Sequence, residues 1–145
     1  MIAGDGQHWR RRLRAIVSHP RRAEVERYID TKVKAAFEAF AAELKDPEMT
    51  PRVEKLDDGM RLAVDHGEND APFIYEVRTV SQPIPPFALT DSARKDTDRS
   101  RYYRAEVFLA QGSRGYDIYG SDEQQVIADV VGHYDRYRHY LALTN

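Results

Sequence analysis

The chain has 145 residues, of which 41% are hydrophobic and 32% are charged, and its formal net charge is −2. This length suits one domain with a sizeable core, and the composition is too apolar for a disordered chain. The absence of cysteine excludes disulfides, cysteine-ligated zinc and thiol catalysis. The nearly neutral charge argues against a general polyanion binder, so we expect no nucleic-acid partner.

The sequence carries no recognisable membrane span or leader. No apolar run approaches the roughly 20 residues that a helix needs to cross a bilayer. Residues 1–7 also lack the apolar stretch of a signal peptide. We therefore expect residues 1–8 to be a flexible start or linker and residues 9–145 to form a single domain.

The first predicted element is a short amphipathic helix rich in arginine, over residues 9–17. Its apolar residues are Trp9, Leu13, Ile16 and Val17, and its arginines are Arg10, Arg11, Arg12 and Arg14. His19-Pro20 interrupts this helix, because proline removes a backbone donor and constrains the residue before it.

A long helix is predicted from Pro20 to about Leu44. Proline is accepted in a first helical turn, and Asp46-Pro47 ends the helical pattern. The predicted buried stripe consists of Val25, Ile29, Val33, Phe37, Phe40 and Leu44.

Three strands are predicted after this helix. Thr50–Leu56 is a weak strand, in which Pro51 suits a sheet edge. Asp57-Asp58-Gly59 is typical of a hairpin turn of type I′, in which glycine adopts a positive φ. Alternating apolar residues then predict strands over residues 60–65 and 73–80, which pair with each other as an antiparallel hairpin.

The last third of the chain predicts a loop, a second hairpin and a helix. Residues 91–101 have almost no apolar side chains, and we expect a mobile loop there. Tyr102–Ala110 and Tyr116–Tyr119 are predicted to pair as strands around a glycine turn at Gln111–Gly115. Ser121 followed by Gln124 is a capping-box signature for the final helix. The apolar side of that helix carries Val126, Ile127, Val130, Tyr134, Tyr137 and Leu141.

These elements predict an α+β fold. We expect a two-layer domain with a mainly antiparallel sheet of about five strands, covered by two long helices. The short N-terminal amphipathic helix is an addition to these two layers.

The signals for catalytic or metal sites are weak. The five histidines form no pair at i, i+4, whereas a zinc site needs three or four converging ligands. The acidic stretch Asp65–Asp70 lacks the ligand spacing of a calcium loop, although weak cation sensing stays open. There is no phosphate-binding loop and no nucleophile-elbow serine. We expect no catalytic residue, no metal and no cofactor.

Tyrosine is concentrated near the C-terminus. Seven of the nine tyrosines follow residue 101 and are interleaved with arginines. Such a face suits quaternary ammonium ligands or nucleic acid. Ordinary core and sheet tyrosines are the favoured interpretation, because strands are enriched in tyrosine.

Four separate blocks of the sequence carry a family resemblance. They read WRRRLRAIVSHPRRAEVERYID, RLAVDHGE, FIYEVRTVSQPIPPFALTD and RYYRAEVFLAQGSRGYDIYGSDEQQVIADVVGHYDRYRHYLAL. In order and spacing they resemble the C-terminal domain of high-affinity choline transporters of the betaine/carnitine/choline transporter family. The resemblance implies a cytosolic domain after the last membrane span, at the cytoplasmic face of the inner membrane. It also implies that the transporter's own membrane domain is the partner, that homo-oligomers form through the parent transporter, and that the substrate cage lies in the membrane domain.

The strongest functional signal is the basic stretch before the long helix. Lysine and arginine clusters beside a membrane attract anionic lipid, with about 1 kcal/mol for each charge near the surface. The predicted membrane or regulatory contacts are Trp9, Arg10, Arg11, Arg12, Arg14, Arg21 and Arg22. The alternative is a solvated arginine face on a helix that docks on the domain.

The leading functional interpretation is a non-enzymatic regulatory domain of a choline or glycine betaine transporter. As the resemblance implies, the domain modulates uptake of compatible-solute precursors in response to osmotic strength. The alternative is a stand-alone module that binds a small ligand or a protein, and a deep ligand pocket favours that alternative.

Overall fold

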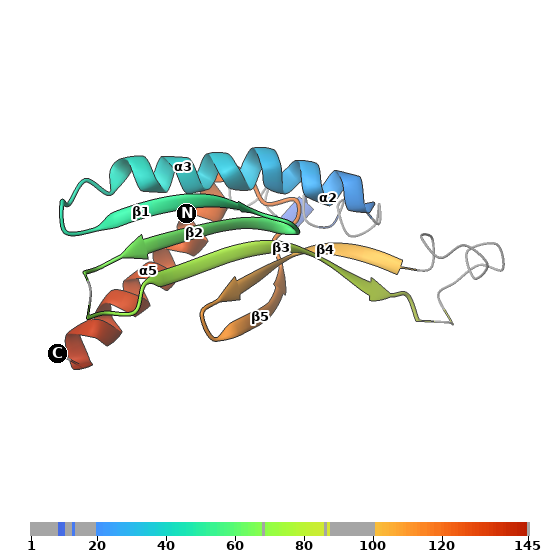
Figure 1. Ribbon diagram of the computed structural model, residues 1–145. Coiled ribbons are helices and arrows are strands. Elements are labelled where there is room, and N and C mark those ends of the chain that lie inside the picture. Colours follow the sequence, from blue (N-terminus) through green and yellow to red (C-terminus); the bar gives the residue numbers. More distant parts are fainter. Residues whose placement is uncertain are drawn as a thin grey trace.

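The computed structural model describes residues 9–10, 13, 20–67, 69–85, 87 and 101–144. Its elements are α2 (Arg22–Tyr28), η1 (Ile29–Val33), α3 (Lys34–Glu43), β1 (Thr50–Leu56), β2 (Gly59–Asp65), β3 (Phe73–Pro83), β4 (Arg101–Leu109), β5 (Gly112–Asp117) and α5 (Glu123–Thr144). The strands form one five-stranded sheet, and Figure 1 shows that it is curved and has helices packed beside it, which confirms the α+β class. Within the described residues, no helix has the length and hydrophobicity that a membrane span requires.

The segments α2, η1 and α3 form one continuous helical stretch, because the residues at their junctions are all in the right-handed helical region. Val25, Ile29, Val33 and Phe37 recur every four residues along it, and all four are fully buried. In a regular α-helix such a repeat drifts by about 40° at each step, because four residues turn by about 400°. The wider π turn of η1 rotates less per residue and keeps the stripe facing the sheet.

The sheet is an antiparallel meander in the order β1-β2-β3-β4-β5. The predicted pairing of residues 60–65 with residues 73–80 is confirmed, with Leu62 opposite Tyr75. The weak first strand is also confirmed, and it forms the edge of the sheet with Pro51 opposite Val64.

The β4–β5 hairpin is confirmed as an antiparallel pair, but its turn is shorter than predicted. β5 begins at Gly112, which pairs with Leu109, so the connection contains only Ala110-Gln111. Gly112 and Gly115 have φ values of 119° and 80° and lie within β5 itself. Glycine tolerates this conformation, and a register shift between Glu106 and Phe108 accompanies it.

The β1–β2 hairpin is confirmed, but the reason expected for Gly59 is wrong. Leu56 pairs with Gly59 across a two-residue turn, and Gly59 is not among the glycines with positive φ. A Cβ atom added at Gly59 would lie 2.0 Å from the carbonyl oxygen of Val77 and 2.8 Å from the Cα of Arg78. Glycine is therefore required by the close approach of β3 and not by the turn.

Both helical regions lie on the same face of the sheet. Tyr75 of β3 contacts Phe37 of α3 through its ring and Asp129 of α5 through its hydroxyl. The prediction of two long helices that cover the sheet is wrong in this form. The structure has one N-terminal helical stretch and one C-terminal helix, and α5 packs mainly along α3 and reaches the sheet at β3. Its final turns lead away from the strands (Figure 1).

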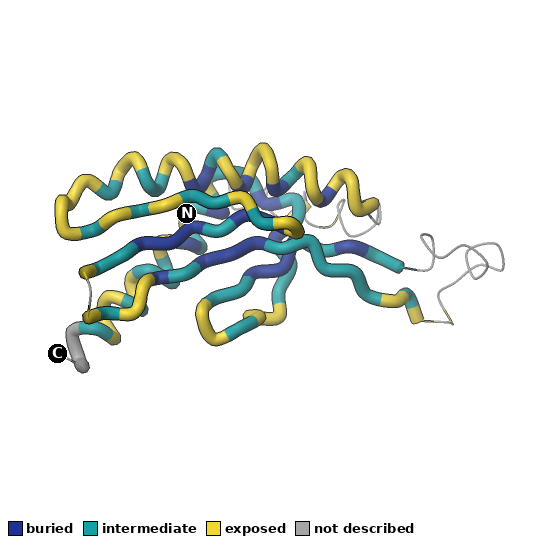
Figure 2. The backbone as a smooth tube through the Cα atoms, viewed as in Figure 1, coloured by how far each residue is buried: buried dark blue, intermediate teal, exposed yellow. Residues whose placement is uncertain are grey.

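The core lies between the N-terminal helical stretch and the middle strands, where Figure 2 shows the buried segments. Phe37 is fully buried, and its ring meets Tyr75 edge to face with 5.6 Å between the centroids. The prediction that Phe37 is a core residue is therefore confirmed. Phe40 and Leu44, at the end of the predicted stripe, are half-buried.

The capping box of α5 lies one residue later than predicted. The backbone N–H of Gln125 donates to the Asp122 side chain, and the backbone N–H of Asp122 donates to the Gln125 side chain, both at 2.9 Å. Ser121 is instead buried, and its carbonyl oxygen accepts a hydrogen bond from Tyr28 at 2.8 Å. The reciprocal pair satisfies two orphan donors at the helix start, as the predicted Ser121 and Gln124 would have done.

Two predicted features lie largely outside the described residues. The predicted mobile loop is one of them, since only Arg101 of residues 91–101 is described, as the first residue of β4. The amphipathic helix is the other, since only Trp9, Arg10 and Leu13 of residues 9–17 are described.

Candidate functional site

The structure describes some of the residues predicted to contact the membrane and not others. Trp9 and Leu13 are 54% and 50% exposed, and the Arg10 guanidinium lies 4.6 Å from the centre of the Trp9 ring. Arg11, Arg12 and Arg14 lie outside the described residues. The two apolar side chains that are described in this stretch are therefore about half exposed.

Arg21 and Arg22 are placed at the start of the N-terminal helical stretch. Both are exposed, and the Arg22 guanidinium lies 5.3 Å from the centre of the Tyr103 ring in β4. A guanidinium over an aromatic face is attracted by the ring electrons. The structure thus brings one predicted basic residue to the tyrosine-rich strand.

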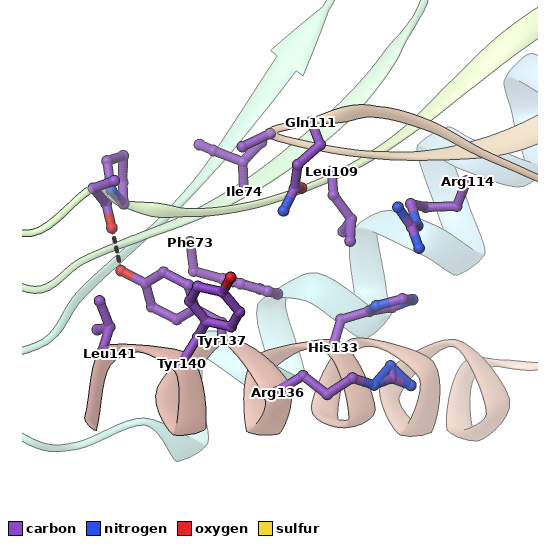
Figure 3. A pocket seen from close by; sticks show the side chains of 13 residues that line it. Phe73, Ile74, Leu109, Gln111, Arg114, His133, Arg136, Tyr137, Tyr140 and Leu141 are labelled. Atoms are coloured by element: carbon purple, nitrogen blue, oxygen red, sulfur yellow. Dashed lines mark hydrogen bonds between the residues drawn. The ribbon is translucent and has the colours of Figure 1, made fainter. Parts of the chain in front are cut away.

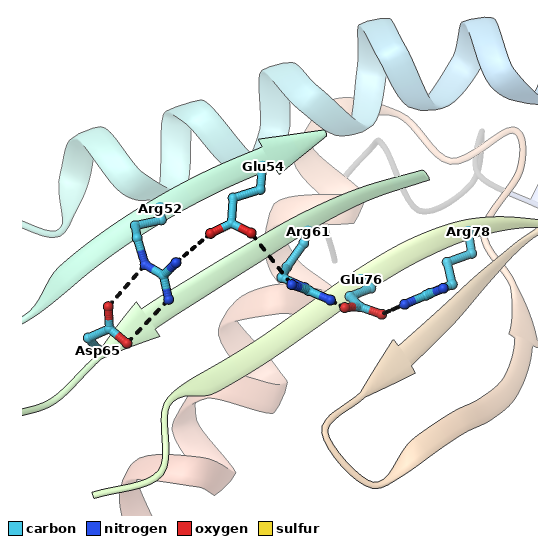
Figure 4. Close-up of polar contacts among 6 residues, drawn as sticks. All are labelled: Arg52, Glu54, Arg61, Asp65, Glu76 and Arg78. Atoms are coloured by element: carbon cyan, nitrogen blue, oxygen red, sulfur yellow. Dashed lines mark hydrogen bonds and ion pairs between the residues drawn. The ribbon is translucent and has the colours of Figure 1, made fainter. Parts of the chain in front are cut away.

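The sheet face opposite the helices carries a ladder of ion pairs that the sequence analysis did not identify. Figure 4 shows charged side chains from β1, β2 and β3 that alternate in sign across this face. The members drawn are Arg52, Glu54, Asp65, Arg61, Glu76 and Arg78. Asp58 extends the ladder at the β1–β2 turn, 3.4 Å from Arg78. Three arginines therefore face four carboxylates on this surface, which we call the charged face.

Glu76 is the centre of the charged face. Its residue is 5% exposed, although no described helix covers this side of the sheet. Its carboxylate lies 2.5 Å from Arg61 Nε and 2.7 Å from Arg78 Nη2. Burial of a carboxylate is costly without charged or hydrogen-bonding partners, and the two arginines supply them. The alternation of charges along each strand hints at this face, but the pairing follows only from the register.

A partly buried polar cluster joins α5 to the sheet. The hydroxyls of Tyr75 and Tyr116 each donate to Asp129 Oδ2 at 2.6 Å. Burial raises the pKa of both tyrosines, and the adjacent carboxylate raises it further, so both remain protonated donors. The Tyr116 hydroxyl uses its single proton in the hydrogen bond to Asp129. His133 Nε2, 2.8 Å from the Tyr116 oxygen, must therefore be the donor in the hydrogen bond between them.

A second cluster surrounds His66 at the start of the acidic loop. Its Nε2 lies 3.0 Å from the Tyr134 hydroxyl, and its Nδ1 lies 3.1 Å from an Arg138 nitrogen. Arginine only donates, so Nδ1 accepts and Nε2 carries the proton of the neutral ring. Burial lowers the pKa of His66, and Arg138 lowers it further. His66 thus packs with tyrosines, and no group of three or more metal-ligating side chains occurs among the described residues.

Most of the tyrosines near the C-terminus contribute to packing, although Tyr140 is 71% exposed. Tyr103 is buried, and Tyr116, Tyr134 and Tyr137 pack against the core with partial exposure. Tyr134 meets Phe40 and Phe73 edge to face, at 5.5 Å and 5.1 Å between centroids. Such contacts are typical of amphipathic core tyrosines, whose hydroxyls find polar partners at the surface.

Comparison of the sequence with known proteins finds relatives among transporters. The chain matches no protein-family model. It is 34% identical over 136 residues to a glycine betaine transporter of Acinetobacter baylyi, a match that covers 93% of this chain and 20% of the relative. It is 30% identical over 143 residues to the osmo-dependent choline transporter BetT2 of the same species, covering 94% of this chain and 20% of the relative.

A third relative comes from another genus. The high-affinity choline transport protein of Escherichia coli is 28% identical over 150 residues, which cover 96% of this chain and 21% of that protein. The chain therefore spans about one fifth of the length of the curated relatives it matches. These relatives are transport proteins and not enzymes, in agreement with the interpretation from sequence. The resemblance is confirmed: along nearly its whole length this chain is homologous to a C-terminal portion of glycine betaine and choline transporters of the betaine/carnitine/choline transporter family.

Proposed function

We propose that this chain is a cytosolic regulatory domain of a transporter for choline or glycine betaine, and that it adjusts uptake to osmotic strength. One observation carries the proposal. A relative named as an osmo-dependent choline transporter aligns with 94% of this chain at 30% identity. In this proposal the membrane domain of the same transporter is the partner, and the domain acts at the cytoplasmic face of the membrane.

The physical basis is the salt dependence of exposed charge contacts. Raising the ionic strength from 0.1 M to 1 M shortens the Debye length from about 10 Å to about 3 Å. Contacts between exposed charges weaken over that range, whereas partly buried pairs such as Glu76 with Arg61 are screened less. A surface contact made by exposed arginines is therefore suited to report the cytosolic salt concentration.

The basic stretch is the proposed sensor. Arg10, Arg11, Arg12 and Arg14 each contribute about 1 kcal/mol of attraction when they lie near an anionic lipid surface. The exposed Trp9 and Leu13 supply the apolar anchors that an interfacial helix inserts at the headgroup boundary. The charged face, with more carboxylates than arginines, is a poor surface for anionic lipid, so the lipid contact is assigned to the basic stretch.

Vesicle co-sedimentation tests this proposal. The 145-residue chain is mixed with vesicles of phosphatidylserine and phosphatidylcholine across a salt series, beside a variant with Arg10, Arg11, Arg12 and Arg14 replaced by glutamine. The control variant removes four exposed cations elsewhere, by replacing Arg27, Lys32, Lys34 and Lys45 with glutamine. We expect wild type and control to bind at low salt and to dissociate as salt rises, and the first variant to bind weakly throughout.

The outcome for the transporter follows from the same change. Replacement of the four arginines should shift the osmolality at which uptake responds and leave the KM for substrate unchanged. Equal vesicle binding by all three proteins, or by none of them at low salt, would remove the lipid contact from the proposal. Regulation would then proceed by docking of the domain on the cytosolic side of its own transporter.

A further inference from the structure

A pocket lies between the second half of α5 and the β4–β5 hairpin, where α5 diverges from the sheet. Its volume is about 490 Å³, within the range of about 300–1,000 Å³ that is typical of small-molecule sites. Figure 3 shows that the pocket has two halves of different chemistry. Phe73, Ile74, Leu109 and Tyr137 line an apolar half, and Arg114, His133 and Arg136 line a basic half.

The basic half holds two arginines without internal partners. Within the described part of the chain, neither Arg114 nor Arg136 makes a hydrogen bond or an ion pair. Their guanidinium groups lie on either side of the His133 ring in Figure 3, one from β5 and one from α5. Among the described residues, no aspartate or glutamate lines the pocket. Two exposed cations that border one cavity, with the His133 ring between them, favour an anionic group in this half of the pocket.

The residues packed behind the pocket also favour an anionic ligand group. Asp129 lies 3.7 Å from His133 Nε2, but it accepts hydrogen bonds from Tyr75 and Tyr116 and does not line the pocket. Its carboxylate thus already accepts two tyrosine hydrogen bonds, although its side chain is 34% exposed. Gly132 has no side chain, so the surface of α5 is open beside Arg136. A Cβ atom added at Gly132 would lie 3.9 Å from Arg136 Nη2.

The apolar half requires a ligand with a hydrophobic body. Phe73 and Tyr137 form its aromatic wall, with 5.5 Å between their ring centroids. The Tyr137 hydroxyl donates to the carbonyl oxygen of Ala71, which fixes the ring at the edge of the cavity. Gln111, in the hairpin turn, adds a neutral amide that can both donate and accept.

We propose that this pocket binds an organic anion with an apolar body, whose carboxylate is held by Arg114 and Arg136 and whose apolar part packs on Phe73 and Tyr137. The inference goes beyond the regulatory role proposed above, because it assigns a ligand to the domain itself. It also separates this site from a choline cage: the aromatic wall alone suits a quaternary ammonium group, but the two arginines repel a ligand that carries only positive charge.

Titration calorimetry with a matched set of probes tests the proposal. Octanoate carries both features of the ligand, octan-1-ol lacks the charge, and choline has the opposite charge. We expect octanoate to bind at millimolar concentration or below, octan-1-ol to bind at least about tenfold more weakly, and choline not to compete. The tenfold difference corresponds to the loss of charge-assisted hydrogen bonds to an arginine.

Two variants locate the site. Arg114→Gln and Arg136→Gln should each weaken octanoate binding by about tenfold or more and leave octan-1-ol binding unchanged. Both arginines are exposed, so these variants should keep the fold, which the far-UV circular dichroism spectrum checks. Arg27→Gln, on α2 and not among the lining residues, is the control with the same loss of charge.

Four results would overturn the proposal. These are no octanoate binding at millimolar concentration, equal affinity for octanoate and octan-1-ol, unchanged octanoate binding in the double variant Arg114→Gln/Arg136→Gln, or tighter binding of choline than of octanoate. None of them depends on vesicle binding or on transport. Failure of this inference is therefore distinguishable from failure of the proposed regulatory role.

Discussion

Because β2 and β3 approach closely at Gly59, we expect a single added methyl group at this position to destabilise the fold. A Cβ atom at this position would lie 2.0 Å from the Val77 carbonyl oxygen and 2.9 Å from the Val77 carbonyl carbon. These atoms belong to the backbone of the neighbouring strand, so no side-chain rotation relieves the overlap. Gly59→Ala must instead separate two strands at Gly59 and Arg78, which are paired in the sheet.

The magnitude follows from known costs of overpacking. An extra methylene forced into packed structure typically costs about 1–3 kcal/mol, and a rigid obstacle places this case at the upper end. Alanine restricts the unfolded chain relative to glycine, which returns at most about 1 kcal/mol. We therefore expect Gly59→Ala to lower the free energy of unfolding by about 2–3 kcal/mol. For a chain of this length, that corresponds to a fall in Tm of about 8–12 °C.

Gly132→Ala is the matched control, because the same substitution should have the opposite sign. Gly132 lies inside α5, and a Cβ atom there meets only the flexible end of Arg136 at 3.9 Å. Alanine in a helix interior is favoured over glycine by about 0.5–1 kcal/mol. We expect this variant to raise the free energy of unfolding by that amount.

Urea denaturation followed by far-UV circular dichroism measures both variants against wild type. The midpoint should fall for Gly59→Ala and rise for Gly132→Ala, with unchanged m-values. A neutral or stabilising Gly59→Ala would refute the argument, since it would mean that β2 and β3 do not approach as described.

Two further predictions concern the core and its histidines. Phe37→Ala should lower the free energy of unfolding by about 3–5 kcal/mol, because the buried ring leaves a cavity beside Tyr75; an unchanged thermal midpoint would mean that the helix presents another face. Burial lowers the pKa of both His66 and His133 below their usual 6.5, so between the lowered values and 6.5 the unfolded state binds more protons than the folded state. The free energy of unfolding should therefore be highest above about pH 6.5 and decrease on acidification below it. In a His66→Gln/His133→Gln variant, the free energy of unfolding from urea titrations should depend less on pH between about pH 5 and 7. Parallel curves for the variant and wild type would contradict the assignment to these two rings.

The capping box shows where local signals become ambiguous. Ser121 with Gln124 and Asp122 with Gln125 have the same spacing, so the sequence alone offers two helix starts. The choice depends on a contact that is distant in sequence. The Tyr28 hydroxyl lies 2.9 Å from the carbonyl oxygen of Ile118 and 2.8 Å from that of Ser121, which holds the chain in a non-helical turn up to Asp122.

Gly59 and the β4–β5 turn show the same limit. Aspartate followed by glycine is a local turn signal, and it correctly locates the β1–β2 hairpin. The reason for glycine lies in β3, which the turn signal does not contain. Likewise, Gly112 and Gly115 indicate positive φ, but the register of β5 against β4 decides that they belong to the strand.

The sequence by itself determined the elements and their buried faces, because alternation in strands and the four-residue repeat in the helix are local properties of the chain. It also indicated the resemblance to choline and glycine betaine transporters, through four blocks in order, and it marked the basic stretch from Arg10 to Arg22. Only the tertiary structure decided which distant polar groups meet. The partners of Glu76, the hydrogen bonds of Asp129, and the pocket between Arg114 and Arg136 all depend on strand register and on the path of α5. Such contacts join residues far apart in sequence, and their energies depend on a desolvation that exists only after the chain has folded.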